Sequence, residues 1–152
     1  MTRAANGLDE LKALTGTDLG RTDWLEVTQQ RVDTFADATD DHQWIHVDEE
    51  RAKDGPFGGT IAHGYLTLSL LIPLFNQLLE IGGVSMSINY GLERVRFPSP
   101  VRVGAKIRLH GVVDRVEEVK GNGVQMNVAF TVEIDGADKP ACVAEAVYRH
   151  YA

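Results

Sequence analysis

The sequence predicts an α+β fold in which an antiparallel β-sheet wraps around a long central apolar α-helix. The segment from about Ala62 to Leu79 carries leucine, isoleucine or phenylalanine on almost every helical face. A helix that is apolar all round must be covered on all sides. From Val124 to Ile134, apolar and polar residues alternate with period two, which is typical of a strand with one buried and one wetter face.

The elements before the central helix are short. We expect a helix at Leu8–Leu14 and a strand at Trp24–Thr28, where side-chain character alternates. Thr28 is a good N-cap for a helix that ends near Thr39. The residues from Asp40 to Val47 have no clean period and predict a loop, followed by a short helical turn at Asp48–Lys53.

The elements after the central helix are strands. Gly82 and Gly83 are expected to end the helix. Four strands should follow, and the second is long enough to bend or bulge: Val84–Phe97, Ala105–Val119, Val124–Ile134 and Ala141–Tyr151. Sheets of this kind have edges to hide, which favours a homodimer.

Length and composition favour one domain over residues 1–152 and exclude several classes of function. The formal net charge of −7 gives no global attraction to nucleic acid or to an anionic membrane. The only membrane candidate, Ile61 to Ile81, contains His63, Asn76 and Glu80 and is better explained as a buried helix. The single cysteine, Cys142, indicates a reducing, cytoplasmic location and is expected to be a small buried side chain.

The densest polar cluster runs from Asp40 to Asp48 and contains Asp41, His42 and His46. An aspartate and a histidine can act together as acid and base on one water molecule. The alternative is a solvated loop whose aspartates cap helices. A metal site is a third interpretation, because two histidines four residues apart lie beside carboxylates, but that spacing needs a helix to align the ligands. We expect no metal.

A second cluster, Gly58 to Gly64, lies directly before the central helix. Helix N-termini present free N–H groups, and glycine allows a ligand to approach the backbone closely. The segment is therefore a candidate oxyanion site, although an ordinary loop leading into a helix would look the same.

Taken together, the two clusters resemble a known family. ATDDHQWIHVD is similar to the signature of the MaoC-like (R)-specific enoyl-CoA hydratases, with Asp41 and His46 in the positions of the catalytic pair. IAHGYLTLSLL resembles the start of the family's central helix, and INYGLERVRFPSPVRVG resembles the strand and turn that follow. The similarity runs from about Thr17 to the end and implies the hot-dog fold.

Three positions depart from the family pattern. Gln43-Trp44 replaces the usual Asn-Pro, and Asp40 replaces the glycine that commonly precedes the catalytic aspartate. The departures leave the acid–base pair intact.

The resemblance implies a hydro-lyase of fatty acid metabolism that reversibly adds water to a trans-2-enoyl-CoA, giving the (R)-3-hydroxyacyl-CoA. Asp41 and His46 would hold the water, and the N–H of Gly64 would stabilise the enolate. Arg96 is the first choice for binding the CoA phosphates, and the apolar interior would take the acyl chain. No cofactor is implied, since coenzyme A is part of the substrate. The alternatives are an acyl-CoA thioesterase of the same fold, a 3-hydroxyacyl dehydratase acting on acyl carrier protein, and a non-catalytic acyl-binding protein.

Overall fold

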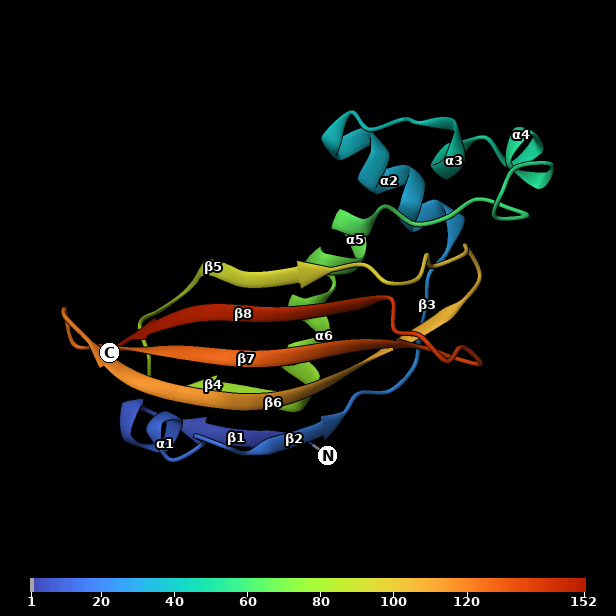
Figure 1. Ribbon diagram of the computed structural model, residues 1–152. Coiled ribbons are helices and arrows are strands. Elements are labelled where there is room, and N and C mark those ends of the chain that lie inside the picture. The colour runs from blue at the N-terminus through green and yellow to red at the C-terminus, as the bar shows by residue number, and fades with distance from the viewer. Residues whose placement is uncertain (1) are drawn as a thin grey trace.

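The main sheet curves around a column of two short helices (Figure 1). In the computed structural model, which describes residues 2–152, the sheet has six strands: five follow the order β2-β6-β7-β8-β5, and the sixth, β3, pairs with β6. All pairs in this sheet are antiparallel. The strands are β2 (Asp18–Arg21), β3 (Leu25–Glu26), β5 (Met86–Arg96), β6 (Lys106–Val119), β7 (Gly123–Ile134) and β8 (Cys142–Tyr151).

The inner face of the sheet and the helical column form one hydrophobic core. The alternating apolar residues of β7 point inward, from Val124 to Val132, and are fully or almost fully buried. They face Leu74 and Leu78 of α6 (Leu71–Leu78), which are also buried. The predicted α+β arrangement of an antiparallel sheet around an apolar helix is therefore confirmed. Cys142 is also buried, and burial raises the pKa of its thiol to about 11.

The central helix is shorter than the sequence predicted. It is divided into α5 (Gly64–Ser69) and α6, and Leu79–Gly82 forms a strand, β4, instead of the last helical turn. Pro73 accounts for the division, because it has no N–H to donate to the carbonyl four residues earlier, at Ser69. The strand β4 pairs in parallel with β1 (Arg3–Asn6), which the sequence did not predict.

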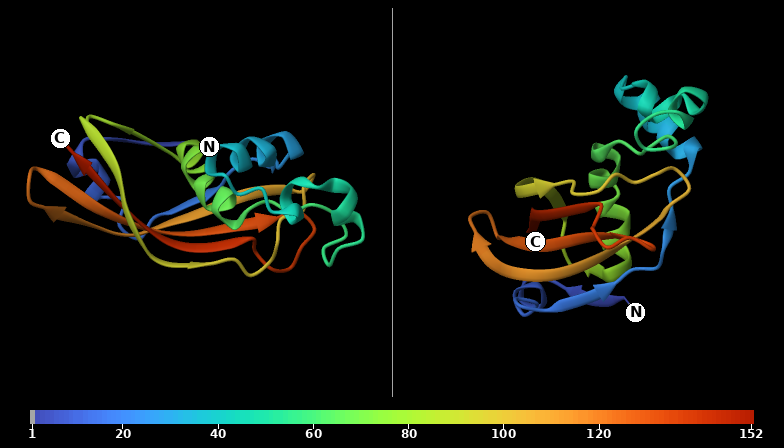
Figure 2. Two further views of the ribbon diagram at one scale, coloured as in Figure 1. Left: turned by 90° about the horizontal axis from the view of Figure 1, so that it is seen from above. Right: turned by 45° about the vertical axis from the view of Figure 1, so that its right-hand side comes forward.

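The remaining helices lie on one side of the strand layer, at the end where α5 begins (Figures 1 and 2). These are α2 (Gln29–Thr39), α3 (Trp44–Val47) and α4 (Glu49–Lys53), while α1 (Leu8–Lys12) lies at the opposite side. The Thr28 side chain caps α2 by accepting a hydrogen bond from the N–H of Arg31, as predicted. The expectation of an uninterrupted loop from Asp40 to Val47 was wrong, because its second half forms α3.

Two long strands carry irregularities where β6 meets β7 and where β5 meets β8. The register shifts between Val113 and Arg115 in β6, as its length suggested, and at two points in β5. The strand β5 is the last in the sheet order, so one of its edges has no partner among residues 2–152. No helix in this part of the chain is long and apolar enough to span a membrane.

Candidate active site

His46 lies on α3 with its side chain buried, and its ring is held by one backbone carbonyl. Nδ1 lies 2.7 Å from the carbonyl oxygen of Ile61. A carbonyl oxygen can only accept a hydrogen bond, so Nδ1 must carry the proton of the neutral ring. The other nitrogen, Nε2, therefore keeps a free lone pair and can act as a base.

The surroundings of His46 favour this neutral form. Burial lowers the pKa of His46 below its ordinary value of 6.5, and the neighbouring His63 acts in the same direction. The hydrogen bond to Ile61 and the carboxylate of Asp41 act in the opposite direction without reversing the shift. Near neutral pH the imidazole is therefore available to take up a proton.

Asp41 lies in the short connection between α2 and α3. Asp40, which caps the C-terminus of α2, has a left-handed backbone conformation with φ 59° and ψ 23°. That conformation turns the chain sharply and suits glycine best, which explains the glycine typical of the family at this position. The Asp41 side chain is about half exposed, with a side-chain relative accessibility of 53%.

His63 is a member of this site that sequence reasoning used only as a landmark for the helix start. Its side chain is buried, and Nε2 donates a hydrogen bond to the backbone carbonyl of Asp41, at 3.0 Å. Its ring stacks on that of His46, with centroids 3.9 Å apart and planes inclined by 24°. Nδ1 of His63 is buried without a hydrogen-bond partner among the described residues. In the sequence, the feature that could have indicated a role for His63 in the site is its position directly before Gly64.

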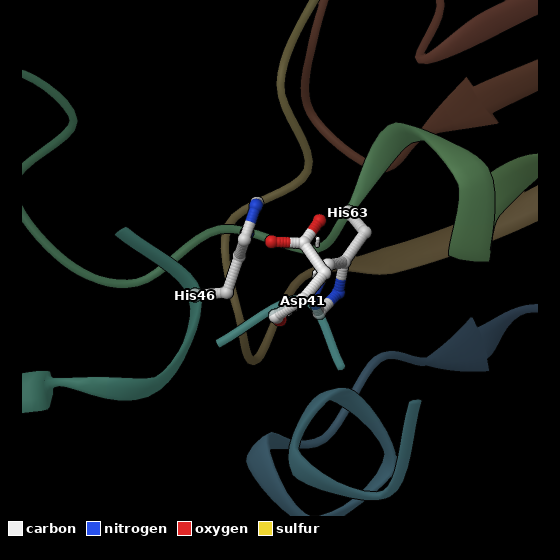
Figure 3. Close-up of side chains that lie close together, drawn as sticks. All are labelled: Asp41, His46 and His63. Atoms are coloured by element: carbon white, nitrogen blue, oxygen red, sulfur yellow. Dashed lines mark hydrogen bonds and ion pairs between the residues drawn. The ribbon is translucent and has the colours of Figure 1, made fainter. Parts of the chain in front are cut away.

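The side chains of Asp41, His46 and His63 lie close together (Figure 3). One possible metal-ligand atom of each lies within 4.8 Å of those of the other two. One water molecule making two hydrogen bonds of about 2.8 Å can bridge such a gap. The three groups are also of the kind that holds a metal ion, with a second nitrogen of each histidine bound to a backbone carbonyl. The His46 and His63 rings are stacked, so the nitrogen lone pairs in their two planes cannot both point at one metal ion. This arrangement suits a bridging water better than a metal.

His42, the other histidine of the predicted cluster, lies outside this group. Its Nε2 is 2.9 Å from a carboxylate oxygen of Asp37 on the exposed side of α2. The spacing of His42 and His46 therefore does not produce a shared site, because the chain between them is loop up to Gln43.

Trp44, which stands where the family usually has proline, has a local explanation. Trp44 is the first residue of α3, where the missing N–H of a proline does no harm and its fixed φ favours the helix. Trp44 lacks the fixed φ of proline, but its ring contacts α4: the guanidinium of Arg51 lies 4.2 Å above the ring centroid. Gly55 leaves room for the ring, since a Cβ there would come within 3.1 Å of it. Trp44 therefore fastens α3 to α4.

Gln29, at the start of α2, ties three segments of the site together. Its side-chain amide donates to the carbonyl of His46 at 2.8 Å, and its carbonyl oxygen accepts a hydrogen bond of 2.6 Å from the Thr60 hydroxyl. The N–H of Ile61 donates to the carbonyl of Ile45 at 3.0 Å. These bonds fix α3 against the segment that leads into α5.

Gly64 is the first residue of α5, so its N–H has no carbonyl four residues earlier in the helix. It lines a cavity of about 290 Å³ together with His46 and Phe97. A Cβ at Gly64 would come within 3.2 Å of the Phe97 ring. The structure thus brings Gly64 and His46 to one cavity, as the two sequence clusters suggested.

Arg96 does not line this cavity. It is the last residue of β5, is exposed, and donates a hydrogen bond to the carbonyl of Val95 at 2.7 Å. Two other arginines are engaged elsewhere: Arg108 donates to the carboxylate of Glu133, and Arg102 donates to the carbonyl of Gly58.

Comparisons with known proteins point in one direction. The model of the MaoC-like domain family matches residues 10–134. A 3-hydroxyacyl-thioester dehydratase Z of Mycobacterium tuberculosis is 50% identical over 150 residues, which cover 99% of each chain. Nodulation protein N of Rhizobium leguminosarum is 44% identical over 139 residues, covering 90% of this chain and 86% of that protein.

Solved structures agree with the fold. The (R)-hydratase of A. caviae involved in PHA biosynthesis superposes with a TM-score of 0.71 at 26% identity, covering 88% of this chain and 94% of that one. A monoamine oxidase regulatory protein from Archaeoglobus superposes with a TM-score of 0.79 at 22% identity, over 100% and 99% of the two chains. The hot-dog fold expected from the sequence is confirmed.

Proposed function

This chain belongs to the MaoC-like domain family and is a hydro-lyase, and from that premise we propose that it is an (R)-specific enoyl-CoA hydratase. It would add water reversibly to trans-2-enoyl-CoA, giving the (R)-3-hydroxyacyl-CoA of fatty acid metabolism. The observation that carries the proposal is the pairing of Asp41 with a buried, neutral His46 whose Nε2 has a free lone pair.

In the proposed reaction, Asp41 and His46 hold one water molecule between them. Nε2 of His46 accepts a proton from the water as its oxygen attacks C3 of the substrate. The electron pair of the C2=C3 bond moves toward the thioester, and C2 then takes up a proton from the pair. The reverse sequence of the same steps dehydrates a 3-hydroxyacyl thioester.

Attack at C3 places negative charge on the thioester oxygen. The N–H of Gly64 is our candidate to donate a hydrogen bond to that oxygen, because it opens a helix and lines the cavity that His46 also lines. A donor of this kind stabilises the transition state more than the ground state, and losing one typically lowers the rate by about 10²–10³.

The acyl chain and the CoA phosphates are assigned to parts of the protein by their polarity and charge. The apolar interior between the helical column and the sheet takes the acyl chain. Arg96 stays our first choice for a CoA phosphate contact: its exposed position next to Phe97 puts it beside the cavity rather than in it. The proposed reaction uses no cofactor and no metal. We also propose a cytoplasmic location.

The free edge of β5 supports a homodimer as part of this proposal. Several of its apolar side chains are exposed, including Met86 at 50%, Tyr90 at 56% and Leu92 at 46%. An unpaired strand edge with exposed apolar side chains is a template for pairing with another chain. Antiparallel pairing of two β5 strands about a twofold axis would cover it.

Incubation with crotonyl-CoA tests the proposal and separates it from the alternatives. Loss of the enoyl absorbance without release of free thiol, and formation of the (R)-3-hydroxy product on chiral analysis, is the expected result. Release of free thiol would instead identify a thioesterase, and no reaction at all would favour a non-catalytic acyl-binding protein. Comparison with crotonyl-acyl carrier protein identifies the carrier.

A further inference from the structure

Two neighbouring cavities lie between the α5–α6 column and β5, and neither is lined by Asp41 or His46. One has a volume of about 330 Å³ and the other of about 500 Å³. Both are lined by Ile72, Asn89 and Tyr148, so these side chains form a common wall. Together the cavities have the size of a binding site for a small molecule.

Tyr148 is the aromatic residue of the common wall. Its side chain is almost fully buried, with a relative exposure of 7%. Its ring stacks on that of Phe75, with centroids 5.4 Å apart and planes inclined by 12°, and meets Phe130 edge-on at 6.3 Å. Its hydroxyl has no hydrogen-bond partner among residues 2–152 and is not one of their buried unpaired atoms, so it is open to solvent or to a ligand. Burial raises the pKa of Tyr148 to about 12, so the hydroxyl stays protonated and can both donate and accept.

The cavities lie along the same helical face as the candidate oxyanion donor. Gly64, Leu68 and Ile72 are spaced four residues apart, which places them along one side of the column. Helical hydrogen bonds continue across the division at Leu70, whose N–H donates to the carbonyl of Leu66 and whose carbonyl accepts from the N–H of Leu74. The eight steps from Gly64 to Ile72 therefore rise about 12 Å. An extended carbon chain advances roughly 1.25 Å per C–C bond, so roughly ten bonds cover that distance.

The wider cavity has a mixed lining whose polar members include Asn76, Asn89 and Ser87, and neither lysine nor arginine lines it. Ser87 and His150 both line it, and the Ser87 hydroxyl lies 2.8 Å from Nδ1 of His150. Burial lowers the pKa of His150, which favours the neutral ring, and the only charged lining residue is Glu80. A neutral oxygen fits these walls, whereas a carboxylate would be repelled by Glu80 and would meet no cation.

We propose that the two cavities bind the far part of an acyl chain that carries a hydroxyl or keto group, with the Tyr148 hydroxyl as its hydrogen-bond partner. The inference rests on the proposed function, because it takes the thioester to lie at Gly64. The oxygen would sit roughly ten bonds from the thioester carbon. A hydroxyl that leaves water for these cavities needs such a partner, since burying it unpaired is costly.

Three trans-2-enoyl-CoA substrates of about ten chain carbons test the proposal: one plain, one with a terminal hydroxyl and one with a terminal carboxyl. The enzyme should hydrate the hydroxylated chain with a kcat/KM about ten-fold above that of the plain chain, and the carboxylated chain least. Tyr148→Phe removes only the hydroxyl. It should abolish the preference for the hydroxylated chain and leave the rate on crotonyl-CoA unchanged.

Tyr90→Phe is the matched control, because Tyr90 is 56% exposed and its ring lies under Arg149, outside both cavities. Equal rates on the plain and hydroxylated chains of the unmodified protein would overturn the proposal, as would an intact preference in Tyr148→Phe. If Tyr148→Phe does not fold, the three-substrate comparison on the unmodified protein decides. Failure to hydrate crotonyl-CoA would refute the proposed function itself, so the two failures are distinguishable.

Discussion

Replacing Gly64 with alanine tests the assignment of its N–H to the developing enolate. The added Cβ would lie 3.2 Å from two carbons of the Phe97 ring, a few tenths of an ångström closer than ordinary contact. Phe97 is 41% exposed and can move aside, so the cost to folding is small, and alanine offsets it by up to about 1 kcal/mol in a helix. The free energy of unfolding should therefore change by less than about 1 kcal/mol.

Activity should respond much more strongly. The methyl group and the displaced ring enter the cavity that Gly64 shares with His46, which keeps the thioester oxygen from the N–H. Loss of one oxyanion donor costs about 10²–10³ in kcat, or about 2.7–4 kcal/mol of transition-state stabilisation. The assay is crotonyl-CoA hydration beside thermal unfolding, with Gly91→Ala as control, because a Cβ at Gly91 meets nothing within 4 Å. Unchanged kcat in Gly64→Ala would refute the assignment.

Further predictions concern the acid–base pair, its pH dependence, the turn before it and the core. Asp41→Asn and His46→Gln should each lower kcat for crotonyl-CoA hydration by about 10² or more, and full activity in either would exclude this mechanism. Because burial lowers the native pKa of His46 below 6.5, kcat/KM should fall as pH drops through that lowered value, and the His46 contribution to stability, present above about 6.5, should be lost over the same range. A pH profile whose acid limb lies above 6.5 would contradict this. Asp40→Gly should unfold with a free energy about 1 kcal/mol above that of Asp40→Ala in urea titrations, with equal activities, because the left-handed φ of 59° favours glycine. Leu74→Ala should lower the free energy of unfolding by about 2–5 kcal/mol, and a smaller loss would mean that α6 is less tightly wrapped than its 1% exposure indicates.

The period of apolar residues predicted the sheet well, because a strand with one buried face needs an apolar residue at every second position. The alternation from Val124 to Val132 appears in the structure as the inner face of β7. The end of the central helix could not be predicted in the same way. Leu79 is apolar whether it continues the helix or begins β4, and the outcome depends on β1, which is distant in sequence and pairs with it at Arg3.

The candidate site was predictable as two clusters but not as an arrangement. Residue types indicated Asp41 and His46, and the glycine-rich segment indicated Gly64. The sequence does not reveal that the His63 ring stacks on His46, because that contact joins segments 17 residues apart through backbone bonds of Ile61 and Asp41. The left-handed turn at Asp40 could not be predicted either. A glycine at this position would have indicated it, whereas aspartate tolerates the conformation but is not typical of it.

The two histidine-to-carbonyl hydrogen bonds link the same two segments in opposite directions. The α3 segment contributes His46, which holds the backbone at Ile61, and the segment before α5 contributes His63, which holds the backbone at Asp41. Neither imidazole can keep its position if the other segment moves away. Heating should therefore inactivate the enzyme by local release of α2–α4 before the strands separate, so that loss of activity is an early, reversible event that precedes unfolding of the sheet.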